Sequence, residues 1–272
     1  MDSDSLIIAV FCLVDDALPQ VTPVGEYLGL DRDTEVFAYR RHYAHFFPAL
    51  GRVHRTTFTR QAANLWRLKE ALWQRLLAPA GCDPRWAMVD SFPVAVCRFA
   101  RAPRCRRFRG EAGFGRDHSI KQVFYGFRLH ARVCWPGVVT RLSVCPASAS
   151  DVALLEELTE ATEGVCLGDR AYWRPELHEW LRRRGLEMLV PFKKAGSDPT
   201  PERSRVISGI RYRIETVFGQ LCERLSVKRV WARDLWHLSS RLLRKVLAHT
   251  VMVVLNREQG NEPLRLGELL TI

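Results

Sequence analysis

The hydrophobic periodicity of this chain changes near residue 80, and the change restricts the folds that the chain can adopt. Before this point, leucines recur at the spacing of one helical face: Leu65, Leu68, Leu72 and Leu76. Helix-breaking residues then follow: Pro79, Gly81 and Pro84. Beyond them come short apolar runs with the alternation typical of strands. We therefore predict a helical region over residues 1–80 and a second domain over residues 81–272.

The second domain combines strands and helices. The predicted strands cover residues 86–92, 124–145 (a hairpin that turns at Trp135-Pro136-Gly137), 165–169 and 186–192. The predicted helices cover residues 151–158, 174–185, 202–225 and 238–256. Several strands followed by strand–helix alternation predict an α/β fold class.

The charge balance indicates a polyanionic partner. The 272 residues include 41 Lys plus Arg against 30 Asp plus Glu, which gives a formal net charge of +11. A hydrophobic content of 47% excludes a disordered chain, so this surplus belongs to a folded protein. The simplest partner is nucleic acid, because Arg, the main basic residue here, binds phosphates well. The alternative explanation is Arg-rich codon usage in a GC-rich genome.

Neither the N-terminus nor the cysteines indicate secretion or membrane insertion. The longest apolar run covers residues 6–14; it is too short to cross a bilayer and follows acidic rather than basic residues. We expect a buried helix there. The cysteines form no Cys-x-x-Cys pair, and most lie in apolar runs, as buried free thiols do. These features predict a soluble, cytoplasmic protein with no membrane partner.

Three acidic residues lie where a charge is costly unless it is paired or binds a metal. Asp90 is inside the apolar strand Met88–Phe92, Asp169 ends a later apolar strand, and Glu215 borders the apolar stripe of a long helix. Together, these carboxylates can bind two hard divalent cations that promote in-line attack on a phosphodiester. Each acid alone has an ordinary explanation: a strand Asp often caps a turn, and Glu215 can pair with Arg211 one helical turn away.

Several ordered segments surround these acids. They are Val89-Asp90-Ser91-Phe92-Pro93, Phe124-Tyr125-Gly126-Phe127-Arg128-Leu129-His130, Ser150-Asp151-Val152, Gly168-Asp169-Arg170-Ala171-Tyr172, and Arg211 with Ile214-Glu215-Thr216-Val217-Phe218. In order and spacing, this set resembles the bacterial insertion-sequence transposases that have a DDE triad, and most closely the insertion sequence 982 family. The resemblance covers nearly the whole chain. A single segment is a weak signal, but the ordered set is specific.

This resemblance implies a ribonuclease H-like catalytic domain with a helical N-terminal DNA-binding region. It implies that Asp90, Asp169 and Glu215 are catalytic and bind two Mg²⁺ ions, for which Mn²⁺ can substitute. The implied reaction is metal-dependent cleavage at insertion-sequence ends, followed by strand transfer of the 3′-hydroxyl into target DNA. The implied partners are double-stranded transposon ends and target DNA, bound by a homodimer because two ends must meet. The expected location is the bacterial cytoplasm, in association with the nucleoid.

Three positions depart from the family's pattern. The wider group often has Tyr and Lys on either side of its third motif, where this chain has Ser208 and Cys222. It also has His beside the Asp of the third matching segment, where this chain has Ser150. These changes concern the positioning of the DNA strand end more than metal binding. They leave two alternatives open: a nuclease of the same fold, and a DNA-binding protein that has lost catalysis.

Further residues are predicted to serve DNA binding or to lie beside the site. The predicted DNA-binding residues are Arg98, Arg101, Arg104, Arg106, Arg107, Arg109 and Arg211. For the arginine run, the alternative is a solvated loop. Tyr172 and His130 are predicted to lie beside the site, and packing explains them equally well. Arginines of the N-terminal region are candidates for reading transposon ends: Arg40, Arg41, Arg52, Arg55 and Arg60. The tryptophans are expected in the core and at helix interfaces.

Overall fold

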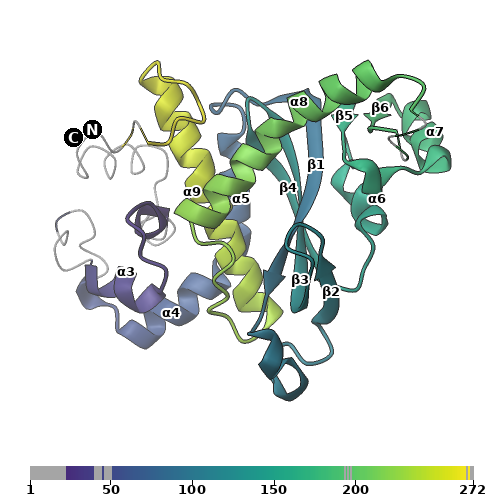
Figure 1. The fold of residues 1–272 in the computed structure, drawn as a ribbon. Helices are drawn as coiled ribbons and strands as arrows, with labels where there is room; N and C mark the ends of the chain where they lie inside the picture. The colour runs from purple at the N-terminus through teal and green to yellow at the C-terminus, as the bar shows by residue number, and fades with distance from the viewer. Residues whose placement is uncertain are drawn as a thin grey trace. The chain divides into compact units, whose positions relative to one another are not determined.

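The structure is a computed structural model that describes residues 23–39, 45, 51–192, 194, 196, 198–267 and 269. The apolar run 6–14 and the arginines Arg40 and Arg41 lie outside these residues. The chain forms two compact units (Figure 1). The first unit combines the described parts of residues 1–81 with 220–272, and the second unit covers residues 82–219.

Within the described part of the second unit, six strands form one mixed sheet. They are β1 (Asp83–Ala95), β2 (Gly113–Asp117), β3 (Gln122–Trp135), β4 (Val138–Pro146), β5 (Gly164–Leu167) and β6 (Leu186–Leu189). One edge of β3 pairs with β2 and then β4, its other edge pairs with β1, and all three pairings are antiparallel. β5 pairs in parallel with β1, and β6 in parallel with β5. The unit is mixed α/β, as the sequence predicts.

The predicted hairpin of residues 124–145 is confirmed by the pairing of β3 with β4. Its turn contains Gly137, whose φ of 132° is strained for other residue types. The Gly137 amide donates a hydrogen bond to the Cys134 carbonyl at 2.8 Å, which closes the turn. β1 is longer than predicted, because pairing with β3 extends it from Asp83 to Ala95.

Alternation along β1 gives the sheet two faces with different coverings. Ala87 and Val89 point into a hydrophobic core with side chains of α6 (Leu155–Leu158), α7 (Pro175–Arg183) and β6. Asp90 and Phe92 lie on the opposite face, against α8 (Pro201–Gly219), and the rings of Phe92 and Phe218 are 4.7 Å apart. Figure 1 shows α6 and α7 near β5 and β6, with α8 passing over β1. The face that contains Asp90 is therefore the face under α8.

Short helical turns follow three of the strands. They are η2 (Phe99–Arg104) after β1, η3 (Asp151–Leu154) after β4 and η4 (Arg170–Tyr172) after β5. The helix predicted over residues 202–225 is α-helical only to the end of α8, and a π-helical turn, η6 (Gln220–Arg224), continues it in the first unit.

The described part of the first unit is helical at residues 23–27 and in α3 (Asp33–Tyr39), α4 (Arg55–Asn64), α5 (Trp66–Leu76) and α9 (Leu235–Glu258). Helices α5 and α9 pack together. The Arg257 guanidinium of α9 donates a hydrogen bond to the Ala80 carbonyl at 3.0 Å. These contacts group residues 220–272 with the N-terminal region, although the sequence analysis assigns them to the domain of residues 81–272. No described helix has the length and hydropathy needed to span a membrane.

The predicted leucine stripe is wrong in part. The helix is interrupted at Leu65, between α4 and α5. The buried face of α5 consists of Lys69, Leu72, Trp73 and Leu76. Lys69 is only 2% exposed, whereas Leu65 and Leu68 are half-buried. This burial is possible because the Lys69 ammonium donates hydrogen bonds to the Ser240 hydroxyl at 2.9 Å and to the Ala62 carbonyl.

Candidate active site

The parallel pairing of β1 and β5 brings two of the predicted catalytic acids together. Met88 is opposite Leu167 in the register, and Asp90 and Asp169 each lie two residues further along. The chain is still extended at Asp169, with φ −81° and ψ 179°. Because side chains alternate in strands and neighbouring strands are about 5 Å apart, both carboxylates lie on the face under α8 and close to one another.

Backbone amides and one arginine hold these carboxylates in place. The Ser91 amide donates a hydrogen bond to Asp90 Oδ1 at 2.8 Å, and the Ala171 amide donates one to Asp169 Oδ1 at 2.9 Å. Arg211 of α8 donates from Nη2 to Asp90 Oδ2 at 2.8 Å. The Arg211 side chain is almost fully buried, and its Nε has no hydrogen-bond partner among the described residues. The Nε–H of Arg211 is therefore a buried donor without an acceptor among the described residues.

Burial makes the charge on both acids costly. Burial raises the pKa of Asp90 to about 6, even though the Arg211 guanidinium acts in the opposite direction. The negative charges of Asp169 and Asp151 raise the same pKa further. Burial also raises the pKa of Asp169. Two half-buried carboxylates that repel one another are a typical environment for a bound cation or a catalytic proton transfer.

Glu215 lies on α8, one turn after Arg211, and its side chain is exposed. Among the described residues, no three His, Cys, Asp or Glu side chains are grouped closely enough to hold a metal ion. The structure thus brings Asp90 and Asp169 together, and places Glu215 on the helix that covers them without adding its carboxylate to the pair.

Another acid, Asp151, lies beside Asp90 and Asp169 and was not among the predicted site residues. The Ser91 hydroxyl donates a hydrogen bond to Asp151 Oδ1 at 2.8 Å. Arg128 Nη1 and His130 Nε2 lie 3.5 Å and 3.8 Å from the same oxygen. The signal for Asp151 was present in the sequence, because it belongs to the matching segment Ser150-Asp151-Val152. The sequence does not predict its contact with the segment of Asp90, because the two segments are 60 residues apart in the chain.

A comparison with models of protein families matches residues 81–234, more than half of the chain, to the Transposase DDE domain. The chain belongs to this transposase family. Searches of curated proteins and of solved structures find no match. The matched range includes Asp90, Asp169 and Glu215. Membership implies a DNA partner, and the family generally uses divalent metal ions.

The two predicted site-adjacent residues of the transposase are both buried. Tyr172 is 1% exposed, and its hydroxyl has no hydrogen-bond partner among the described residues. Burial and the nearby charges of Asp90, Asp151 and Asp169 raise its pKa well above the usual value, so the phenol is neutral. His130 is fully buried, and burial lowers its pKa to about 4. His130 is therefore a neutral neighbour of Asp151.

The arginine run of the transposase follows β1 on η2 and the turn after it. All six of its arginines are exposed: Arg98, Arg101, Arg104, Arg106, Arg107 and Arg109. Phe108 anchors the turn, because its ring lies 5.1 Å from that of Phe127 of β3. The Tyr125 hydroxyl also donates a hydrogen bond to the Phe108 carbonyl at 3.4 Å. These contacts hold the exposed arginines against β3. We call residues 98–109 the basic loop.

Two of the three positions that depart from the family pattern lie on α8 and directly after it, and the third, Ser150, precedes Asp151. The Ser208 hydroxyl donates a hydrogen bond to the Ser204 carbonyl at 2.9 Å, within α8. Cys222 lies in η6, beyond the end of α8. In the N-terminal region, Arg52, Arg55 and Arg60 are exposed.

Proposed function

We propose that this transposase cleaves DNA at the ends of its insertion sequence and transfers the freed 3′-hydroxyl into target DNA. It would do so as a member of the insertion sequence 982 family, with a ribonuclease H-like catalytic domain. The observation that supports this most strongly is the β1–β5 register, which brings Asp90 and Asp169 together under the helix of Arg211 and Glu215. Two carboxylates held on a rigid sheet suit phosphodiester chemistry.

The carboxylate oxygens of Asp90 and Asp169 are donors that a hard divalent cation prefers. Together with Glu215, whose exposed carboxylate lies apart from this pair in the structure, they would hold two Mg²⁺ ions, or Mn²⁺ in their place. Burial, and after it the charges of the neighbouring acids, raise the pKa of Asp90, and a bound cation relieves both effects by stabilising the carboxylate. When bound, the ions supply an activated hydroxyl nucleophile and stabilise the leaving oxygen.

Arg211 has two tasks in this proposal. Its Nη2 donates a hydrogen bond to Asp90 and offsets part of the carboxylate charge in the free protein. The remaining N–H groups of its guanidinium would donate to a phosphate oxygen of the bound strand, because charge-assisted hydrogen bonds to phosphate are strong. The guanidinium would thus fix the scissile phosphate relative to the carboxylate that it already contacts.

The DNA backbone would bind to the exposed arginines. The basic loop would contact phosphates near the acids, because it follows directly from the end of β1. Residues 1–80 would bind the transposon ends, with 81–272 as the catalytic domain and its C-terminal helices. A homodimer would bring the two ends together. The protein would work in the bacterial cytoplasm, at the nucleoid.

A strand-transfer assay with the element's own inverted-repeat ends and Mg²⁺ tests this function. Joined products support it, nicks without joining indicate a nuclease of the same fold, and binding without cleavage indicates a protein that has lost catalysis. Asp169→Asn should abolish cleavage, and Glu176→Gln, an exposed acid of α7, should not. An Asp169→Asn protein that cleaves at the wild-type rate would refute the site assignment.

A further inference from the structure

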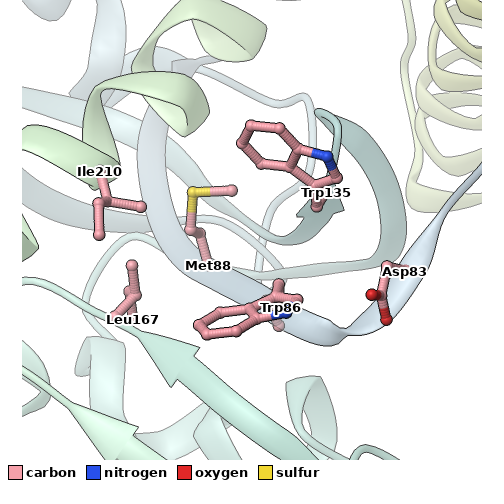
Figure 2. A pocket seen from close by; sticks show the side chains of 7 residues that line it. Asp83, Trp86, Met88, Trp135, Leu167 and Ile210 are labelled. Carbon is pink, nitrogen blue, oxygen red and sulfur yellow. The ribbon is translucent and has the colours of Figure 1, made fainter.

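An apolar pocket of about 440 Å³ opens on the face of the sheet that contains the paired acids. Its lining residues all belong to the second unit: Asp83, Trp86, Ala87, Met88, Trp135, Leu167 and Ile210. Figure 2 shows the Trp86 and Trp135 side chains on different sides of the pocket, with Met88 between them and Ile210 and Leu167 at its other end. Nothing in the proposed cleavage chemistry uses this pocket.

Three of the residues that line the pocket precede the acids or Arg211 by one or two positions. Met88 lies two residues before Asp90 on the same face of β1, and Leu167 lies two residues before Asp169. Ile210 directly precedes Arg211 on α8. Two residues of strand span roughly 7 Å, which is about two steps of the 3.4 Å rise per nucleotide in B-DNA. A DNA strand whose phosphate reaches the acids therefore has a neighbouring base within reach of the pocket.

Two walls of the pocket are exposed tryptophans, contrary to the expectation that the tryptophans lie in the core and at helix interfaces. Trp86 is 55% exposed and Trp135 is 47% exposed. The Arg213 guanidinium lies over the Trp135 ring, 4.1 Å from its centroid, and Nη1 donates a hydrogen bond to the Pro136 carbonyl at 2.8 Å. A fixed cation stacked on an exposed indole provides a flat surface with positive charge beside it.

These properties match a nucleotide better than an apolar protein segment. A nucleobase offers a flat face to the indoles, and its phosphate offers the negative charge that complements Arg213 and Arg211. Among the lining residues, the acid Asp83 is bound by Arg85 through two hydrogen bonds of 2.9 and 3.0 Å, which offsets its charge. Because two of its walls are exposed tryptophans, the pocket is open to solvent, and the polar edge of a base can remain hydrated.

We propose that this pocket binds an unpaired nucleobase of the DNA strand next to the phosphate held at Asp90 and Asp169. The inference rests on the proposed function, because it needs DNA at those acids. The base leaves the duplex and stacks on Trp86 and Trp135, and the stacking energy holds the strand while it is cut. Stacking on an aromatic side chain is tolerant of sequence, so the pocket fixes the position of the strand rather than reading the base.

The test measures binding without chemistry, using Asp169→Asn protein and a duplex with a short 3′ tail of thymidines. A second probe has the same tail with the bases removed. The Asp169→Asn protein with both tryptophans in place should bind the thymidine tail about tenfold more tightly than the abasic tail. Trp86→Ala or Trp135→Ala should remove this preference and leave affinity for a blunt duplex unchanged. Trp86→Phe and Trp135→Phe should restore most of it.

Trp231→Ala is the matched control. Trp231 is 48% exposed and has the Arg32 guanidinium 4.5 Å from its ring, but it lies in the first unit. Its loss should leave the preference for the thymidine tail intact. If both pocket variants keep the tenfold preference, the proposal is overturned. The proposal is also overturned if the pocket variants lose the preference only because they change from dimer to monomer in sedimentation. The pocket would then be an interface between copies of the chain. Failure of the proposed function appears separately, as absence of cleavage by wild-type protein with Mg²⁺.

Discussion

Each unit of the molecule contains a cluster of buried charges, and the two clusters are paired differently. In the first unit, Arg244 and Lys245 of α9 both bind Glu26, and Arg244 also binds Asp33. Arg244, Lys245 and Glu26 are each about 2% exposed. In the second unit, Asp90, Asp169 and Asp151 lie near one another, with Arg211 on one of them and Arg128 beside another.

The two clusters shift the pKa of a buried acid in opposite directions. Asp33 is largely buried, yet its neighbours Arg244 and Arg241 hold its pKa below the usual value. Asp90 is buried to a similar extent but has a single arginine, Arg211, as its counter-charge, and its pKa is raised to about 6. The difference is the amount of counter-charge within reach. A buried acid with sufficient counter-charge maintains the fold, and one without it is a candidate for binding a cation.

The largest effect expected is on catalysis by Asp169→Asn. Cleavage should fall by about a thousandfold or more, since metal binding contributes several kcal/mol to the transition state. The free energy of unfolding should stay constant or rise, because burial makes the Asp169 charge unfavourable. Cleavage assays and urea denaturation on the same protein measure both. A large loss of stability would mean that this cluster is structural as well.

Glu26→Gln in the first unit should, in contrast, lower the free energy of unfolding. The change leaves Arg244 and Lys245 buried without the carboxylate that both of them bind. Breaking a buried pair in this way costs about 3–5 kcal/mol. Urea denaturation measures the loss, and Glu35→Gln, an exposed acid of α3, is the control. A change below 1 kcal/mol, on the order of a surface substitution, would show that the first cluster is not needed for the fold.

Lys69→Met removes a buried amine next to the first cluster. Burial lowers the pKa of Lys69 from 10.5 to about 7. Between these values the unfolded chain binds the proton and the folded chain does not, so wild-type stability should rise as the pH increases from 7 towards 10. Below pH 7 the cost of the buried charge is fully present.

The Lys69→Met protein should lose most of that rise and be more stable at pH 7, by about 1–3 kcal/mol. The Ala62 carbonyl keeps a donor in this variant, because the Ser240 hydroxyl also bonds to it at 3.1 Å. Thermal unfolding at several pH values measures the effect. An unchanged pH dependence would contradict the assignment of the rise to Lys69.

Asp151→Asn tests how much the third acid contributes to the second cluster. The negative charge of Asp151 raises the pKa of Asp90, so its removal should lower that pKa from about 6 by up to about one pH unit. Asn still accepts the hydrogen bond from the Ser91 hydroxyl. Carboxyl NMR titration of metal-free protein measures the shift, with Glu176→Gln as an exposed control. A pKa that does not move would separate Asp151 from the site.

The smallest effect is expected on the exposed charges of the basic loop. Arg106→Gln should leave the free energy of unfolding unchanged within about 0.5 kcal/mol. It should reduce the slope of log affinity against log salt by about one, because one phosphate contact is lost. Titrations of DNA at several salt concentrations measure the slope. A slope equal to that of the wild-type protein would place Arg106 away from the DNA backbone.

Local pattern was enough to predict much of the second unit. The hairpin at Trp135-Pro136-Gly137 follows from alternation on either side of a turn signal, which is information held within a few residues. Asp90 and Asp169 stood out because a carboxylate in an apolar strand is costly. The family resemblance rested on the same short segments, and the match over residues 81–234 agrees with it at the level of a DDE transposase.

Other features depend on which distant elements meet, and no local pattern contains that information. Lys69 is buried because Ser240, far along the chain, accepts its hydrogen bond. Trp86 and Trp135 look like core residues in sequence, but the end of the sheet leaves both exposed beside Ile210. Asp151 lies beside the acids through a hydrogen bond with Ser91, 60 residues earlier in the chain.

By itself, then, the sequence determined the residue types, the local strands and the family, because periodicity and motif spacing act over short distances. The tertiary structure decided which acid faces which: the parallel register of β1 and β5 aligns Asp90 with Asp169, and α8 brings Arg211 onto Asp90. The reason is that strand register and helix packing are set by contacts between segments far apart in the chain.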